Sequence, residues 1–533
     1  MNFNPSDLYG VLPALILSAG ALLLLTSEVF LRGVKPAALG GTGGPAESAQ
    51  RELPAGSDAK PQAAPLAPDR RYQAWVAAAV AAAALWAALS QLGEPSLPLF
   101  SGAAVSDGFA RVIAAVVCAT LLVSCLVAFS YLESLRATRG EFYALSLFSA
   151  AGMCLLAQAT DLIVIFISLE VMSLAVYALC AWLRRGRRPA EAAFKYFILG
   201  SFASALFLYG AALAFGATGS TRLADVAAAL RGGAPAGSSA LLFGAVALLA
   251  SGFAFKVAAV PFHMWVPDVY DGAPAPVTGF MAAGVKAAAF ATLVRILVAG
   301  FGDAASALGP HGWRDLVAGL AVLTMLGGNL LAIPQRSVKR MLAYSSIAHA
   351  GYLLVAVASM AGSAPRASAT EGLLFYLASY AATVLGAFAV VAIIERRLLA
   401  TGTGDDLSSW AGLADRHPGL AAAMSLFMIS LAGIPPTAGF MAKLTVFRPA
   451  IEAGLAPLAI FGVLTSVAGL YYYLRVVVYV YMYPAGKTEA AQGGRLLSVG
   501  VAIAGCALLV LWLGIQPGTF AALTQSAAAA FAR

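Results

Sequence analysis

The sequence predicts an all-α integral membrane protein with about 14 transmembrane helices. Three observations lead to this fold class: 61% of the 533 residues are hydrophobic, only 11% are charged, and apolar runs recur from end to end. A water-soluble surface needs more charge than this. The runs are long and do not alternate, which excludes a β-barrel, because backbone groups in lipid must then be satisfied within helices.

We expect a single polytopic membrane domain over residues 1–533. Each apolar run is long enough, at about twenty residues, to cross a bilayer. The fourteen predicted segments are 8–31, 72–92, 108–130, 140–159, 161–183, 191–216, 240–266, 275–300, 314–333, 338–360, 370–395, 418–447, 455–482 and 496–515.

Residues 32–71 separate the first two segments and differ from them in composition. They are rich in Ala, Gly and Pro and contain almost no large apolar side chains. Such a segment cannot bury enough apolar surface to offset the entropy cost of ordering it. We therefore expect a disordered cytoplasmic loop. Its Gly-Gly-Thr-Gly-Gly run lacks the flanking strand and helix of a nucleotide-binding loop.

Loop charge predicts the orientation of the chain, because Lys and Arg collect on the cytoplasmic side. The loops after odd-numbered segments hold twenty Lys and Arg, whereas the other loops hold at most six. Both termini are therefore expected on the periplasmic side of a bacterial inner membrane. The formal net charge of +8 follows from this asymmetry and requires no nucleic-acid partner.

The cysteines give no sign of a metal or redox centre. All five lie within apolar segments, and none belongs to a Cys-x-x-Cys or Cys/His cluster. Small buried hydrophobic residues explain them. The sequence therefore predicts no cofactor and no metal site in this chain.

Segment five carries one acid in its apolar run, Glu170. Ser173 and Tyr177 follow it by three and seven residues and so share its helix face. A carboxylate in this setting is expected to pair with a buried cation; the alternative is a neutral, hydrogen-bonded glutamic acid. Segment six adds Lys195 about one turn inside the cytoplasmic boundary, where its ammonium could instead snorkel to the headgroups.

Segment seven places Lys256 five residues before Pro261. A lysine at the centre of a membrane helix costs roughly 2.5 to 3.5 kcal/mol and marks a functional site unless it snorkels. Proline removes an intrahelical hydrogen bond, and interrupted helices beside ionisable groups line the ion sites of transporters. Segment eight carries Lys286 with about 13 Å of helix on either side, so snorkelling explains it less well.

Segment ten bears a polar stripe on an otherwise apolar helix. Ser345, His349 and Tyr352 are spaced four and three residues apart and therefore lie on one face. Histidine is the side chain best suited to pass a proton near neutral pH. The alternative is a histidine that packs in the core with its hydrogen bonds satisfied.

Segment twelve repeats the pattern of segment seven, because Pro435-Pro436 interrupts it and Lys443 follows within two turns. The sequence PVTGFMAAGVK that ends at Lys286 is also echoed by PPTAGFMAK, which ends at Lys443. We therefore expect two antiporter-like halves, 140–300 and 314–482, arranged as inverted five-helix repeats with broken helices seven and twelve.

Three stretches resemble the antiporter-like membrane subunits of respiratory complex I, the proton-pumping NADH:quinone oxidoreductase. They are FKVAAVPFHMWVPDVYDGAPAPVTGF, VKRMLAYSSIAHAGYLL and SLAGIPPTAGFMAKLTVF, and the similarity extends over nearly everything from the third segment onward. Within this family, subunit M carries a glutamate where Lys443 stands here, and subunit L continues into a long lateral helix. Both features favour the subunit N branch. The long loop at 32–71 is the one feature that differs from the pattern of that branch.

The resemblance implies that the buried charges form one proton relay. Its expected members are Glu170 and Lys256 as a charged pair, Lys195 near that pair, Lys286 as the central relay, His349 beyond it, and Lys443 facing the exit. The implied partners are other membrane subunits of complex I, the lipid bilayer and protons. NADH, flavin mononucleotide, iron–sulfur clusters and quinone are expected in other subunits.

Three other functions are compatible with these features. A cation/proton antiporter subunit would use the same fold and lysines without redox input, and a membrane subunit of an energy-converting hydrogenase would couple to another reaction. A chemically silent scaffold would hold a membrane assembly together with purely structural charges. Lysine variants that assemble and pump normally would establish the scaffold.

Overall fold

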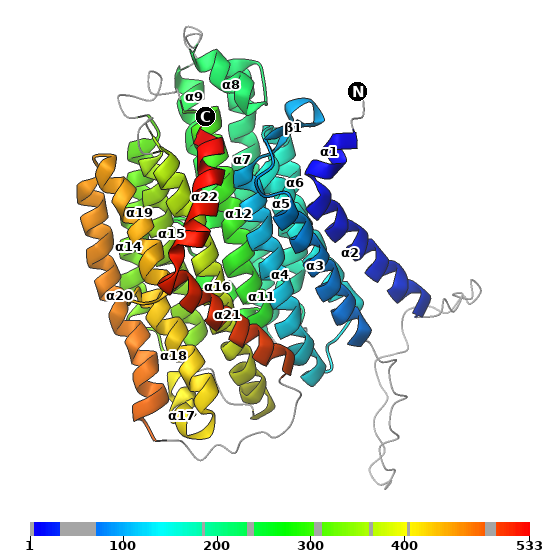
Figure 1. Cartoon of the computed structure of the whole chain (residues 1–533), viewed down its shortest axis with the longest axis vertical. Helices are drawn as coiled ribbons and strands as arrows, with labels where there is room; N and C mark the ends of the chain where they lie inside the picture. The colour runs from blue at the N-terminus through cyan, green and yellow to red at the C-terminus, as the bar shows by residue number, and fades with distance from the viewer. Residues whose placement is uncertain are drawn as a thin grey trace, which may run out of the picture.

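The computed structural model describes residues 5–31, 71–183, 187–231, 239–302, 312–361, 366–401, 406–484 and 497–532. Within these ranges the chain is almost entirely helical, and most helices run side by side in one bundle (Figure 1). The loop predicted over 32–71 lies outside the described residues except for Arg71.

The first part of the bundle contains the N-terminal helices, a β-hairpin and the helices of the first half. The helices are α1 Pro5–Gly10, α2 Leu12–Leu31, α3 Arg71–Ser90, α4 Gly108–Ser134, α5 Gly140–Gln158, α6 Leu162–Cys180, α7 Arg187–Thr218, α8 Leu223–Arg231, α9 Ser239–Val257, α10 Val266–Gly272, α11 Ala275–Phe280 and α12 Lys286–Val294. The hairpin pairs β1 Leu97–Leu99 with β2 Ala104–Ser106 in antiparallel register.

The second part contains the remaining helices. They are α14 Arg314–Ala332, α15 Val338–Ser359, α16 Arg366–Thr401, α17 Leu413–Arg416, α18 Pro418–Ala432, α19 Ala438–Glu452, α20 Ala456–Met482, α21 Leu497–Ile515 and α22 Pro517–Ala532. Short 3-10 turns occupy Phe100–Gly102 and Leu407–Trp410, and π-helical turns occupy Met281–Val285 and Arg295–Gly300.

The helices fall on the fourteen predicted segments, and most boundaries are shifted by a few residues. Segment seven was predicted to end at 266, but its helix ends at Val257. Among the described residues, thirteen helices are long and apolar enough to cross a membrane. Segment twelve is divided into α18, which is apolar but shorter, and α19. The sequence did not predict α22, and Figure 1 shows that it continues from α21 toward the end of the bundle where the N-terminus lies.

Three crossings form the centre of the bundle. An 18-residue stretch of the crossing Ala275–Gly300 is completely buried inside the protein, and corresponding stretches of α15 and α16 are nearly so. By contrast, α7, α20 and α21 expose large apolar side chains such as Phe202, Leu464 and Leu508. The central crossings therefore carry their polar residues away from lipid, while the periphery suits a hydrocarbon environment.

Two crossings are interrupted at the positions where the sequence places prolines. After α9 ends at Val257, Ala258 adopts a left-handed φ of 66° and the chain turns before α10. After α18 ends at Ala432, Gly433 has a φ of 84° and α19 begins five residues later. In both places, backbone groups leave the regular helix beside a buried lysine.

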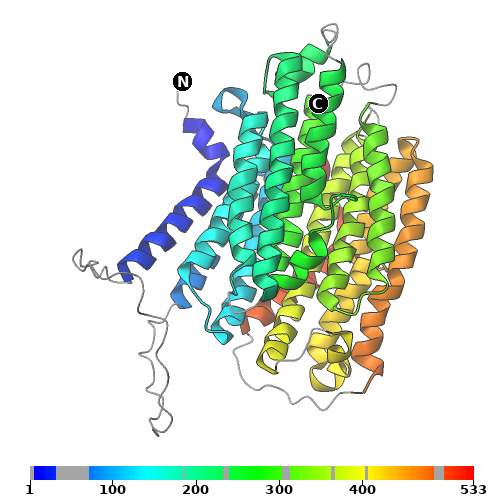
Figure 2. The ribbon, with the colours of Figure 1, turned by 180° about the vertical axis from the view of Figure 1, so that it is seen from behind.

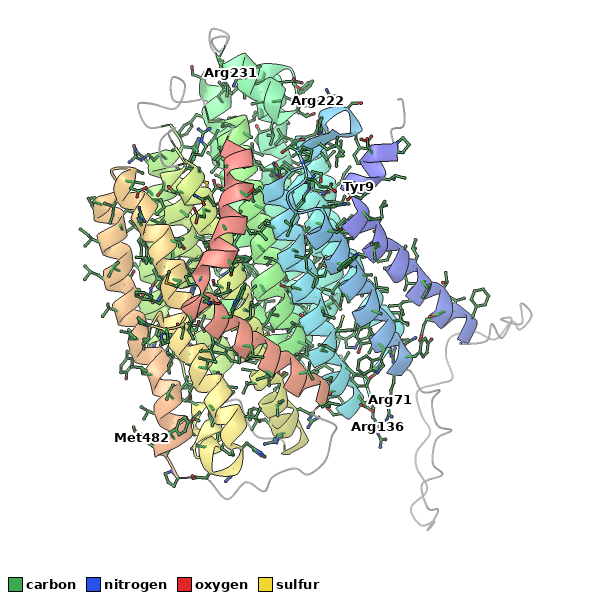
Figure 3. All side chains as sticks on the ribbon, in the orientation of Figure 1. Tyr9, Arg71, Arg136, Arg222, Arg231 and Met482 are labelled. Atoms are coloured by element: carbon green, nitrogen blue, oxygen red, sulfur yellow. The ribbon has the colours of Figure 1, made fainter. Side chains whose placement is uncertain are left out.

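Residues from different predicted loops lie at opposite ends of the bundle. Figure 3 shows Arg71 and Arg136 at one end and Arg222, Arg231 and Tyr9 at the other. The chain termini lie at the second end, which is also visible from behind in Figure 2. The loops predicted to be cytoplasmic and those predicted to be external therefore segregate to opposite ends.

Candidate functional site

Lys256 is held by one face of α6. Its side chain is 3% exposed, and its ammonium donates to Ser173 Oγ at 2.8 Å and to Tyr177 OH at 2.9 Å. The same ammonium lies 5.1 Å from the centre of the Tyr177 ring and 5.6 Å from that of Tyr196, within cation–π range. Neutral hydroxyls and aromatic rings thus replace water around this charge.

Glu170 lies on that same face of α6 but binds a different partner. Its Oε1 accepts a hydrogen bond of 2.5 Å from Ser204 Oγ on α7. Within the described residues no ion pair joins this carboxylate to Lys256, so the direct charged pair expected from the sequence is not formed in this structure. Ser173 and Tyr177, which were predicted to share the face of Glu170, accept the hydrogen bonds of the Lys256 ammonium instead.

Lys195 does not join this group. Its side chain is 40% exposed and forms ion pairs of 2.8 Å with both Glu191 and Asp268. Asp268 also binds Arg340 at 3.0 Å. Partial burial alone would raise the pKa of Asp268, but the hydrogen bonds and charges of Lys195 and Arg340 outweigh it and hold the pKa below its usual range. The snorkelling alternative therefore describes Lys195 better than a relay position.

Lys286 lies at the centre of the bundle, directly after the π-helical turn Met281–Val285. Its side chain is 3% exposed, and its ammonium donates to Ser346 O at 2.5 Å and Ser346 Oγ at 2.6 Å. The Tyr380 ring lies 4.7 Å away. Because single π-helical turns often mark functional positions in membrane and soluble helices, this local geometry agrees with a functional lysine.

His349 follows Ser346 by one turn of α15 and bonds through both ring nitrogens. Nδ1 is 2.6 Å from Tyr376 OH on α16, and Nε2 is 3.1 Å from Tyr473 OH on α20. Tyr473 OH also bonds Ser345 Oγ at 2.5 Å. The predicted polar stripe of α15 is thus in contact with hydroxyl groups of two neighbouring helices.

Lys443 lies at the interruption of segment twelve. Its ammonium donates to the carbonyls of Leu431 at 3.1 Å and Ala432 at 2.7 Å, the last residues of α18. It also donates to Ser466 Oγ at 2.6 Å and lies 5.5 Å from the Tyr352 ring. The free carbonyls and the negative end of the α18 dipole therefore stabilise this charge.

A small cavity lies beside His349. Its lining includes His349, Tyr376, Ser379, Tyr380, Thr383, Ser430, Leu431, Gly439 and Ala442. Leu431 also accepts a hydrogen bond from Lys443 through its carbonyl oxygen. The hydroxyls of Ser379 and Tyr380 are buried without a protein partner.

Several residues of this site escaped the sequence reasoning. Ser346, Tyr380, Tyr473 and Ser466 contact the buried lysines or the histidine, yet each is an ordinary residue on an apolar helix. The run of three tyrosines at 471–473 was the one available signal, because hydroxyls on a membrane helix need partners inside the protein.

Comparison with known proteins places the chain in a family. Residues 159–469 match the family described as "NADH:quinone oxidoreductase/Mrp antiporter, TM". NADH-quinone oxidoreductase subunit N of Myxococcus xanthus is 45% identical over 553 aligned residues, which cover 99% of each chain. The chain belongs to the NADH-quinone oxidoreductase subunit N family.

Solved structures agree with membership of the subunit N family. A chain of respiratory complex I from Thermus thermophilus, solved with aureothin, is 33% identical with a TM-score of 0.73, and the match covers 96% of this chain and 98% of that one. A chain of the Mrp complex from Dietzia is 22% identical with a TM-score of 0.76, covering 98% and 97%. The second likeness concerns the fold alone.

Among the residues that the structure describes, no group of three or more His, Cys, Asp or Glu could hold a metal ion. All five cysteines are buried and unpaired by disulfides. The groups that the site offers are proton donors and acceptors: ammonium, imidazole, carboxylate, hydroxyl and backbone carbonyl.

Proposed function

We propose that this chain translocates protons as a membrane subunit of NADH:quinone oxidoreductase, respiratory complex I. The observation that carries the proposal is a set of three buried lysines and one histidine, each bonded to hydroxyl groups, inside a multi-pass bundle. Electron transfer from NADH to quinone would take place in other subunits, where NADH, flavin, iron–sulfur clusters and quinone would be bound.

The proposed relay has three stations. Lys256 on α9, with Glu170 on the neighbouring helix, forms the first; Lys286 with Ser346 and His349 forms the second; and Lys443 at the end of α18 forms the third. The last two are close through Leu431, which lines the cavity beside His349 and binds Lys443 through its carbonyl oxygen. Protons would move between these stations through hydroxyls whose hydrogen atoms can rotate.

The energetic requirement is modest. Moving one proton against about 150 mV costs roughly 3.5 kcal/mol. An approach or withdrawal of the Glu170 carboxylate from Lys256 would change the electrostatic energy of the ammonium by an amount of this order, because charges interact strongly where water is excluded. The separate partners of the two groups, Ser204 for Glu170 and Ser173 and Tyr177 for Lys256, support an arrangement in which the carboxylate and the ammonium are apart.

The proposed setting is a bacterial inner membrane with both termini in the periplasm. The segregation of Lys and Arg to the loops of one end supports this orientation. The neighbours of the chain would be other membrane subunits of complex I and lipid.

The proposal is tested by Lys286→Ala in assembled complexes reconstituted into vesicles. We expect proton uptake per NADH oxidised to fall at least tenfold, because the substitution removes the central ammonium and its two hydrogen bonds to Ser346. Lys195→Gln is the matched control, since it removes a lysine of the same protein that pairs at the surface. Normal pumping by the Lys286 variant would favour the scaffold function.

A further inference from the structure

A buried ion pair lies outside the relay. Lys339, at the start of α15, forms an ion pair of 2.7 Å with Glu395, near the end of α16. Their side chains are 2% and 15% exposed. Truncating one partner of such a pair leaves an uncompensated charge in a region that water does not reach, so the arrangement demands a reason.

Each member of the pair also holds the short connection between α10 and α11. Lys339 Nζ donates to Ala273 O at 2.7 Å, and Glu395 Oε2 accepts from Ala275 N at 3.0 Å. Ala275 is the first residue of α11, so its N–H has no partner within the helix. Tyr131 OH on α4 donates to the same carboxylate oxygen at 2.8 Å.

This carboxylate is therefore the cap of the crossing that carries Lys286. A negative charge at a helix N-terminus is stabilised by the helix dipole and satisfies a backbone donor. From Ala275 the crossing continues through a π-helical turn to Lys286, roughly 16 Å further along at 1.5 Å per residue. The cap thus fixes the near end of the helix whose middle carries the central lysine.

Helix α15 contacts the crossing that carries Lys286 at a second point. On α15, Lys339 and Ser346 are seven residues apart and lie on nearly the same face. Lys339 contacts the connection before α11, and Ser346 contacts Lys286 itself. Helix α15 thus holds this crossing at two points, about two turns apart, and the first of them sets the register in which the second can form.

We infer that Lys339 and Glu395 are positioning residues, which clamp residues 273–275 and thereby keep Lys286 in hydrogen-bonding register with Ser346. The inference rests on the proposed function, since it concerns the geometry of the proposed relay. It also assigns a physical link between the two halves of the chain, because α10 and α11 belong to the first half and α15 and α16 to the second.

The first experiment uses Glu395→Gln in assembled complexes, with two readouts. Hydrogen exchange of peptides covering 266–280 should increase, because the neutral amide no longer anchors Lys339 beside Ala273. Proton uptake per NADH oxidised should fall at least threefold, while NADH oxidation itself changes less. The control is Glu133→Gln, which removes an exposed ion pair of 2.6 Å with Arg71 at the same end and should alter neither readout. Unchanged exchange and coupling in Glu395→Gln would overturn the inference.

A second pair of variants separates positioning from simple charge balance. The exchange Lys339→Glu with Glu395→Lys keeps an ion pair but moves the carboxylate away from Ala275 N, so coupling should stay low. Restored coupling would show that charge balance alone matters and would refute the clamp. Lys339→Arg keeps both the charge and a donor for Ala273 O and should recover most of the coupling.

Tyr131→Phe provides a milder test in case the Glu395 variant fails to assemble. It removes only the hydrogen bond that the Tyr131 hydroxyl donates to the Glu395 carboxylate. It should raise exchange over 266–280 by a smaller amount, and unchanged exchange would count against the clamp. Lys286→Ala is measured in parallel. If that variant pumps normally, the proposed relay fails, whereas the exchange data still decide whether the clamp exists.

Discussion

Gly433 offers a sharp test of how Lys443 is held. This residue ends α18 with a φ of 84°, a conformation that costs an L-residue roughly 1 to 2 kcal/mol. A methyl group added at its Cα would lie 2.8 Å from both Cδ and Nζ of Lys443. Because ordinary contacts begin near 3.4 Å, Gly433→Ala must displace the lysine by at least 0.6 Å.

A displacement of this size is enough to break the longest of the three hydrogen bonds of Lys443. That bond, to Leu431 O, is already 3.1 Å long. Each charge-assisted hydrogen bond contributes roughly 1.5 to 3 kcal/mol, which corresponds to a tenfold or larger change in the population of the native position. We therefore expect Gly433→Ala to lower proton uptake per NADH oxidised at least fivefold in vesicles containing the assembled complex.

Gly454→Ala is the matched control for backbone strain. Gly454 follows α19 with a φ of 75°, yet an added methyl group there meets nothing within 4 Å. Both variants should lose thermal stability through backbone strain, and Gly433→Ala should lose more because it also disturbs Lys443; only Gly433→Ala should lose coupling. Equal coupling in the two variants would refute the claim that the position of the Lys443 ammonium limits pumping.

Two further predictions concern charge. Lys443→Arg should pump poorly because guanidinium stays protonated at any accessible pH, whereas Lys443→Glu should retain more activity; vesicle assays in which arginine equals lysine would contradict a proton-releasing role. Because the pKa of Asp268 is lowered in the folded protein, the Asp268 carboxylate stabilises the fold at every pH above the ordinary pKa of aspartate. This stabilisation is lost only as the pH falls through the lowered pKa of the folded state. Asp268→Asn should therefore lower the melting temperature by the same few degrees at pH 5 and pH 8, and a loss that varies between these values would refute this assignment.

The helical membrane fold could be predicted because membrane helices are set by local composition. Length, hydropathy and loop charge are properties of neighbouring residues, and they located most crossings within a few residues. The two inverted five-helix repeats stay a prediction. The interruptions near Pro261 and Pro435 were also visible, since proline acts on its own helix. The helix α22 was missed because its alanine-rich run follows directly on segment fourteen and has no apolar stretch of spanning length.

The site was predictable in its charges but not in its contacts. Buried lysines stand out in an apolar sequence, whereas the serines and tyrosines that bind them do not. Which hydroxyl meets which ammonium depends on how helices distant in sequence are rotated against each other. The expected pairing of Glu170 with Lys256 illustrates this, because helix periodicity placed Ser173 and Tyr177 on the correct face without saying which of the three groups reaches the ammonium.

The partners of the buried lysines divide them by chemistry. Lys256, Lys286 and Lys443 donate to hydroxyls and backbone carbonyls, which are neutral. Lys339 donates to the carboxylate of Glu395. If one of the first three loses its proton, it leaves a neutral amine among neutral groups, so deprotonation creates no unpaired charge.

Deprotonation of Lys339 would instead leave the Glu395 carboxylate without its counter-charge, at the cost of an unpaired buried ion. A lysine with neutral partners can therefore exchange protons repeatedly, whereas a lysine bound to a carboxylate is held in one charge state and serves structure. The sequence alone presents all four as lysines within or beside apolar segments. Their different roles follow from the atoms that the fold brings to each ammonium.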